Sequence, residues 1–166
     1  FDKITPVEVP ADLKATLRPY QQQGLNWLNF LDDFNFGGCL ADDMGLGKTM
    51  QIIAFILSQR KKRERNTNLL VVPTSIIFNW QAEVKKFAPS ISIHTIYGAD
   101  RIKSTADFDG HEIILTSYGT LLADINFLKH YQFNYIFLDE SQQIKNPDSQ
   151  RYKAARLLKS RNRITI

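Results

Sequence analysis

Residues 37–57 read GGCLADDMGLGKTMQIIAFIL and decide the fold. Two glycines open a short apolar run at residues 39–41, and this run predicts a strand. A glycine-rich stretch follows, after which apolar side chains recur at Met50, Ile53, Ala54 and Leu57, the spacing of one helix face. Further apolar residues fill the flanks, so we expect this helix to be buried on nearly all sides. A strand, a glycine-rich turn and a buried helix therefore follow one another directly.

The turn between strand and helix has the composition of a phosphate-binding loop. Gly45, Gly47, Lys48 and Thr49 lie in the context in which such a loop has a mechanism. Glycines let backbone N–H groups approach phosphates closely, and the helix start adds a partial positive charge of about +0.5. We expect Lys48 to reach the β- and γ-phosphates and the Thr49 hydroxyl to bind Mg²⁺. Asp42 replaces the usual first glycine, and an ordinary strand-to-helix turn is the competing interpretation.

A second motif lies far along the chain, where an apolar run at residues 135–138 ends in Asp139 and Glu140. A carboxylate at the end of a buried parallel strand emerges at the edge where α/β folds bind ligands. We expect Asp139 to hold Mg²⁺, through water, and Glu140 to polarise the attacking water. Acidic residues often end strands, so the assignment of this pair to a nucleotide site depends on the presence of the predicted phosphate loop.

The rest of the chain alternates between short apolar runs and helical patterns. Residues 1–17 read as an extended lead-in, and residues 18–166 read as one domain. Pro19 suits the first turn of a helix, in which Tyr20, Gly24, Trp27, Leu28 and Leu31 make one buried face. Further strands are predicted at 69–72, 91–97, 112–116, 135–138 and 164–166. Thr74 or Ser75 is expected to cap a helix that carries Ile77, Trp80, Val84 and Phe87, and further helical stretches are predicted near 118–131 and 148–159. Such alternation predicts an α/β domain with a mainly parallel sheet covered on both faces.

Composition narrows the class of protein further. The formal net charge is +4, and the densest basic stretch is residues 60–65. A solvated helix end is our first interpretation of that stretch, and nucleic-acid contact is the second. The single cysteine, Cys39, is expected to be a small buried core residue, and the three histidines lack metal-ligand spacing. No run approaches the ~20 apolar residues of a membrane span, and the first residues do not resemble a signal peptide, so we expect an intracellular protein without a membrane partner.

These motifs resemble the SWI/SNF family of DNA-translocating ATPases over most of the chain. The similar blocks are LRPYQQQGLNWL (17–28), DDMGLGKTMQ (42–51), LLVVPTSIIFNWQAEVKKFAP (69–89), ILTSYGTL (114–121) and DESQQIKN (139–146). The resemblance implies a RecA-like lobe in which Gln21 contacts adenine. It further implies that the nucleotide lies against Asp43, Met44, Gly45, Leu46, Gly47, Lys48, Thr49 and Met50. Residues near Pro73, Thr74, Thr116, Ser117 and Tyr118 would face a nucleic-acid backbone.

The resemblance also implies an activity and partners. It indicates an ATP- and Mg²⁺-dependent translocase on double-stranded DNA, completed by a second RecA-like lobe with an arginine finger that would follow RNRITI at 161–166. Gln142 replaces the commoner histidine of the acidic box, which affects how the two sites are coupled. An RNA helicase lobe and a non-catalytic nucleotide-sensing module are the alternatives, and the few insertions favour a bacterial cytoplasm over a nucleus. Gln21 could instead be a solvated helix residue. Trp80 and Tyr118 could each be either a packing residue or a base-stacking platform.

Overall fold

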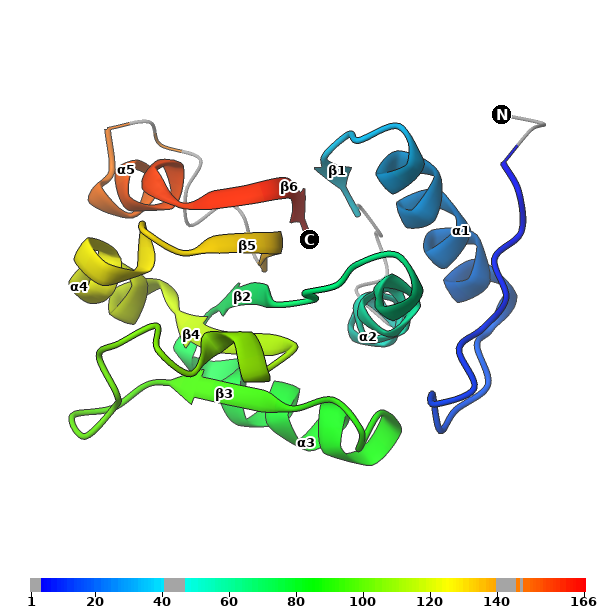
Figure 1. The fold of residues 1–166 in the computed structure, drawn as a ribbon, viewed down its shortest axis with the longest axis horizontal. Helices are drawn as coiled ribbons and strands as arrows, with labels where there is room; N and C mark the ends of the chain where they lie inside the picture. Colours follow the sequence, from blue (N-terminus) through cyan, green and yellow to red (C-terminus); the bar gives the residue numbers. More distant parts are fainter. Residues whose placement is uncertain (1–3, 41–46, 140–145, 147) are drawn as a thin grey trace.

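The computed structural model describes residues 4–40, 47–139, 146 and 148–166. Within these ranges six strands form one sheet in the order β1-β6-β5-β2-β4-β3, and all neighbouring strands are parallel (Figure 1). The strands are β1 (Gly38–Cys39), β2 (Asn68–Val72), β3 (Ile93–Ile96), β4 (Ile113–Ser117), β5 (Gln132–Leu138) and β6 (Lys159–Thr165). The predicted α/β class with a parallel sheet is confirmed.

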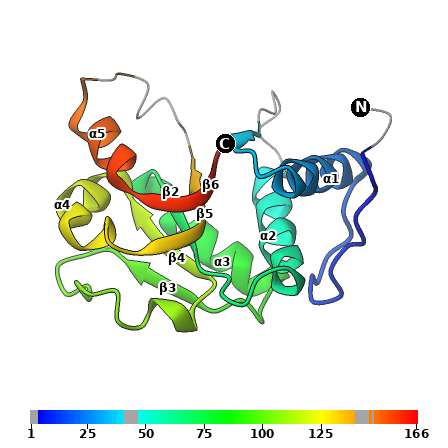
Figure 2. The same cartoon turned by 45° about the horizontal axis from the view of Figure 1, so that its top comes forward.

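Helices cover both faces of the sheet (Figure 2). They are α1 (Pro19–Asp33), α2 (Lys48–Ser58), α3 (Ile77–Phe87), α4 (Tyr118–Leu128) and α5 (Gln150–Leu157), with short 3-10 turns at Gln59–Lys61, Thr74–Ile76 and Phe108–Gly110. One core cluster joins α1, α2 and α3 to one face, and a second joins α4 and α5 to the other. None of the described helices combines the length and apolar character that crossing a bilayer requires.

Strand β2 shows why the centre of the sheet is so apolar. Its five residues are all buried, with Leu70 and Val72 in one core cluster and Leu69 and Val71 in the other. A strand flanked by β4 and β5 and covered on both faces needs apolar side chains at every position. The predicted continuous apolar strand is therefore confirmed. At its end Val72 pairs with Ser117 of β4, so the carboxyl ends of these two strands lie side by side.

Helices α1 and α2 approach each other closely at Gly24. A Cβ atom at this position would lie 1.6 Å from the side-chain oxygen of Gln51, which is itself buried. Glycine thus allows α1 to pack directly on α2. The predicted buried face of α1 is correct for Leu28 and Leu31, whereas Trp27 is only half-buried and Tyr20, in the first turn of α1, is 39% exposed.

Other local predictions also needed correction. Cys39 is exposed, because the two-residue strand β1 lies at the edge of the sheet beside β6 and offers little cover. Neither Thr74 nor Ser75 caps α3; they belong to a 3-10 turn, and Ile76 occupies the N-cap without a side-chain hydrogen bond. Strand β6 begins at Lys159, five residues before the predicted start, because its polar first half pairs with β5.

A buried carboxylate, Asp32 at the end of α1, joins distant parts of the lobe. Its side chain is 1% exposed and accepts hydrogen bonds from Gln59, Lys62, Arg63, Tyr135 and Arg161. Burial alone would raise the pKa of this carboxyl group. The bonds from Tyr135, Gln59 and Lys62 outweigh burial and hold the pKa below its ordinary value. Asp32 therefore stays ionised and ties α1 to α2, β5 and β6.

The basic stretch at residues 60–65 is occupied by internal ion pairs. Four of its five cations contact carboxylates: Arg60 pairs with Asp12 and Glu112, Lys62 with Asp32 and Asp33, Arg63 with Asp32, and Arg65 with Asp109. The stretch is thus neither simply a solvated helix end nor a set of unengaged cations. Most of its charge is neutralised by the fold.

Candidate nucleotide and nucleic-acid site

The carboxyl edge of the sheet gathers the described site residues. Pro73 follows β2, Ser117 ends β4, and Asp139 follows β5. The N–H of Asp139 donates to the carbonyl of Val71, and Val72 pairs with Ser117, so these three strand ends are held together by the sheet itself. A parallel sheet brings all its carboxyl ends to one edge, which is where ligands of α/β folds bind.

The described end of the predicted phosphate loop has backbone features that suit an anion. Gly47 is in the left-handed region at φ 83° and precedes Lys48, the first residue of α2. The first N–H groups of a helix have no partner within the helix and point outward with its positive dipole end. Lys48, Thr49 and Met50 occupy this first turn and are half-buried. This turn offers backbone donors, one ammonium group and one hydroxyl to a phosphate.

Gln21 lies directly against Gly47, the described end of the predicted phosphate loop. Its side-chain oxygen accepts the N–H of Arg18 at 2.8 Å, which directs the amide nitrogen towards Gly47. A Cβ atom on Gly47 would lie 2.4 Å from that nitrogen and 2.8 Å from the hydroxyl of Tyr20. The structure therefore brings the residue assigned to adenine to the residue that ends the phosphate loop. Gln21 is 8% exposed, so the alternative of a freely solvated helix residue is wrong.

Asp139 is held by side chains from two other blocks of the sequence. The indole N–H of Trp80, on α3, donates to a carboxylate oxygen of Asp139 at 3.3 Å. The hydroxyl of Tyr118, on α4, donates to the backbone carbonyl of Asp139 at 2.7 Å. Both aromatic side chains are almost completely buried. One contact thus orients the carboxylate and the other fixes the backbone from which it projects.

The residues assigned to nucleic acid differ in accessibility. Thr74 is exposed and Pro73 is half-buried, at the end of β2. Ser117 caps α4 by accepting the N–H of Thr120 at 3.1 Å. Thr116 is fully buried and donates its hydroxyl to the carbonyl of Ile96. Together with the burial of Tyr118, this leaves the exposed turn after β2 and the backbone around the α4 cap as the accessible parts of this edge.

Several predicted site residues lie outside the described ranges. These are Asp42, Asp43, Met44, Gly45, Leu46, Glu140 and Gln142. Their assignments stay predictions. The described part of the site therefore consists of Gln21, the start of α2 and Asp139 with its two aromatic partners.

The contact between Trp80 and Asp139 was not predicted from the sequence, which suggested either a packing residue or a base-stacking platform. It is 3% exposed, so base stacking is excluded in this fold. A buried indole N–H needs an acceptor, and Trp80 lies on the helix after β2, beside the strand that ends in Asp139. The need for an acceptor could have indicated a polar contact for Trp80, although a single sequence does not show which group accepts the bond.

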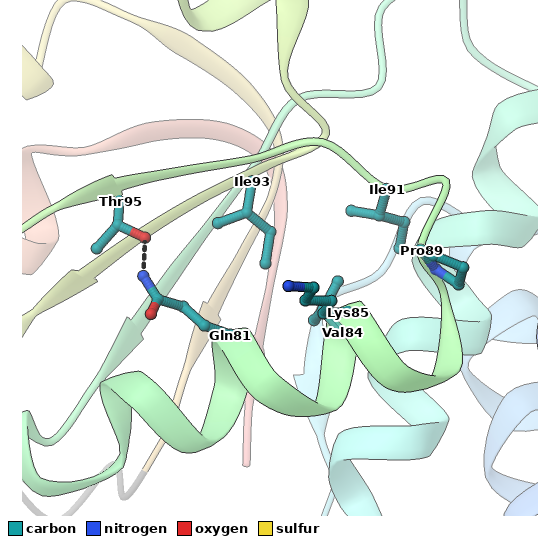
Figure 3. A pocket seen from close by; sticks show the side chains of 7 residues that line it. All are labelled: Gln81, Val84, Lys85, Pro89, Ile91, Ile93 and Thr95. Atoms are coloured by element: carbon teal, nitrogen blue, oxygen red, sulfur yellow. Dashed lines mark hydrogen bonds between the residues drawn. The ribbon is translucent and has the colours of Figure 1, made fainter.

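Two hollows in the described part of the chain lie away from these residues. A cavity of about 240 Å³ separates α3 from the edge strand β3, where Gln81 donates to Thr95 at 2.6 Å (Figure 3). A larger groove of about 950 Å³ runs between the lead-in and the carboxyl-terminal ends of α1 and α2. Neither is lined by Gln21, Lys48 or Asp139.

Comparison with known proteins agrees with this geometry. Residues 20–166 match the SNF2-related domain. The chain is 44% identical to a Bacillus subtilis protein named as an ATP-dependent helicase/translocase, YwqA, over 96% of the chain and 18% of that protein. It is 39% identical to the helicase SWR1 of Candida albicans, over 99% of the chain and 10% of that protein. The chain therefore spans less than a fifth of either relative.

Solved structures give the same result. The Sulfolobus solfataricus SWI2/SNF2 ATPase core in complex with double-stranded DNA superimposes with a TM-score of 0.88 at 43% identity, covering 97% of this chain and 33% of that one. A second structure, of the Sulfolobus solfataricus SWI2/SNF2 ATPase core domain, gives a TM-score of 0.84 at 42% identity, covering 98% of this chain and 33% of that one. With the family model, these similarities show that the chain belongs to the SNF2-related domain family and forms one lobe of a SWI2/SNF2-type ATPase core.

Proposed function

We propose that this lobe binds Mg-ATP and forms the first half of an ATP-driven translocase on double-stranded DNA. One observation carries the proposal: a single sheet edge gathers the start of α2, the ends of β2 and β4, and an aspartate held by side chains from both neighbouring blocks. The likeness to a core solved with double-stranded DNA supports the choice of polymer.

The nucleotide would lie at the start of α2. Lys48 would neutralise the β- and γ-phosphates, and Gln21, already against Gly47, would contact the adenine. The hydroxyl of Thr49 and the carboxylate of Asp139 are the hard oxygen ligands that Mg²⁺ prefers. Mg²⁺ bound there would neutralise charge on the phosphates. Glu140 would orient and polarise the attacking water.

DNA would be held by its phosphate backbone at the exposed turn after β2 and at the cap of α4. Pro73, Thr74 and Ser117 mark these places, and such contacts carry little sequence information. Trp80 lies six residues beyond Thr74 on the same segment, and Tyr118 directly follows Ser117. Because both aromatics bond to Asp139, a shift of either segment on DNA would change the position of that carboxylate. We infer that this is a route of coupling between the two sites.

Hydrolysis would need a second RecA-like lobe of the same parent chain. An arginine finger supplied across such a cleft contributes about 10³–10⁵ in rate. The lobe alone is therefore expected to bind nucleotide weakly and to hydrolyse it very slowly. Closure on ATP and opening after hydrolysis would move the two lobes along the duplex.

The test is DNA-stimulated ATP hydrolysis by the full-length protein. Duplex DNA should raise the rate, and Glu140→Gln should abolish the stimulated rate. Lys48→Ala should weaken Mg-ATP binding while leaving the melting temperature without ligand nearly unchanged. Absence of any stimulation would favour a nucleotide-sensing module, and ATP-dependent separation of RNA strands would favour an RNA helicase. A collapse of the fold in Lys48→Ala would make that lysine structural.

A further inference from the structure

The positive charge of this chain is concentrated at its end. Residues 148–166 contain six basic residues and one acidic residue, whereas the other 147 residues contain fifteen basic and sixteen acidic ones. The net charge is therefore +5 in residues 148–166, which contain α5 and β6, and −1 elsewhere. A segregation of charge of this kind is an electrostatic mark of contact with a polyanion.

Inside this segment five of the six cations, all except Arg151, divide into two groups. Arg161 bonds to Asp32, and Arg163 donates to the carbonyls of Ala155 and Leu158 at the end of α5, so both are used by the fold. Lys153, Arg156 and Lys159 are exposed. Among the described residues none of these three forms an ion pair, unlike four of the five cations at 60–65.

The exposed side of α5 continues from the carboxyl edge of the sheet. A Cβ atom on Gly119, in the first turn of α4, would lie 3.9 Å from a guanidinium nitrogen of Arg151 in α5. The start of α5 is therefore next to the cap made by Ser117. From there α5 runs along the outside of the lobe beside α4, and Lys159 begins the next strand (Figures 1 and 2).

We propose that the exposed face of α5 with Lys159, the α5 basic face, is a second contact for the phosphate backbone of double-stranded DNA. It would bind phosphates beyond those held at the carboxyl edge, and it rests on the proposed function for the choice of DNA. Three unpaired cations on one short segment suit a regularly charged backbone and need no base contacts. Leu157 is the one large apolar side chain exposed on described α5, which is too little for an apolar protein partner.

The test compares two triple variants of the full-length protein. Lys153→Gln/Arg156→Gln/Lys159→Gln removes the α5 basic face. Lys14→Gln/Lys85→Gln/Lys86→Gln removes the same charge at the far end of α3, where these three lysines are also exposed. The dissociation constant for a duplex of about 30 base pairs, roughly three helical turns, is measured over a range of salt concentrations without nucleotide.

The salt dependence gives the number of phosphate contacts. Each lost contact lowers the slope of log K against log salt by about 0.9, so loss of three lowers it by about 2.7. We expect this decrease for the α5 variant and little change for the α3 variant, with equal melting temperatures. Equal slopes for both variants would overturn the α5 basic face, and an acidic protein segment would then be its better partner. If the unaltered protein binds no duplex, the result contradicts the proposed function itself and not only the α5 basic face.

Discussion

Trp80→Phe tests whether the aromatic contact to Asp139 serves the nucleotide site. The substitution keeps a ring in the core but removes the indole N–H that donates to the carboxylate at 3.3 Å. Hydrogen bonds to charged groups contribute about 1.5–3 kcal/mol, and this one is long and reaches a half-buried carboxylate that water can partly solvate. We therefore expect a loss of about 1 kcal/mol, which corresponds to an approximately fivefold weaker affinity for Mg-ATP.

The assay is titration of the full-length protein with nucleotide, with Mg²⁺ and in its absence. Because Asp139 is proposed to act through the metal, the fivefold loss should be seen with Mg²⁺ and disappear without it. Val84→Ala is the matched control: it lies one turn further on α3, is 1% exposed and belongs to the same core cluster. It should cost on the order of 2 kcal/mol of stability and leave Mg-ATP binding unchanged. An equal loss for Trp80→Phe with and without Mg²⁺ would refute the reasoning.

Two further predictions concern the stability of the fold and the recognition of the nucleotide base. Asp32→Asn should lower the free energy of unfolding by about 3 kcal/mol in denaturant titrations, because it leaves three cations around a buried site without their carboxylate. The pKa of Asp32 is depressed and that of Tyr135 is raised, so the contribution of this pair to the free energy of unfolding should be complete near neutral pH. This contribution should be lost below about pH 4 and above about pH 10, and a free energy of unfolding that does not change with pH would contradict the prediction. Gly47→Ala places a side chain at φ 83° and against Gln21, so it should cost about 1–2 kcal/mol and reduce the preference for ATP over GTP. An unchanged preference for ATP over GTP would show that Gln21 does not contact the nucleotide base.

The sheet, and the edge at which its candidate site residues gather, could be predicted because both depend on local patterns. An all-buried strand such as β2 must be apolar at every position, and residues 69–72 are. The first turn of α2 and the acid after β5 then follow from the rule that parallel strands share a carboxyl edge. Boundaries were less predictable. The first half of β6 is polar, and only its pairing with β5 makes it a strand.

Contacts between distant polar side chains could not be predicted in the same way. Nothing near Asp32 in the sequence indicates that Tyr135 and Arg161 will bond to it, since they are brought together only by the completed sheet. Cys39 illustrates the opposite error. Its apolar neighbours suggested burial, but a two-residue edge strand cannot provide it.

The aromatic contacts to Asp139 show how these distant bonds relate to function. A phosphate loop and a strand-end acid alone would make a nucleotide site that is indifferent to the polymer beside it. Here the acid accepts hydrogen bonds from side chains of two segments that also carry the proposed DNA contacts, the exposed turn at Thr74 and the backbone around the α4 cap. Rigid, buried rings transmit small displacements better than flexible exposed side chains, because packed interiors resist compression. Coupling in this lobe would therefore depend on Trp80 and Tyr118 more than on any residue that touches either ligand.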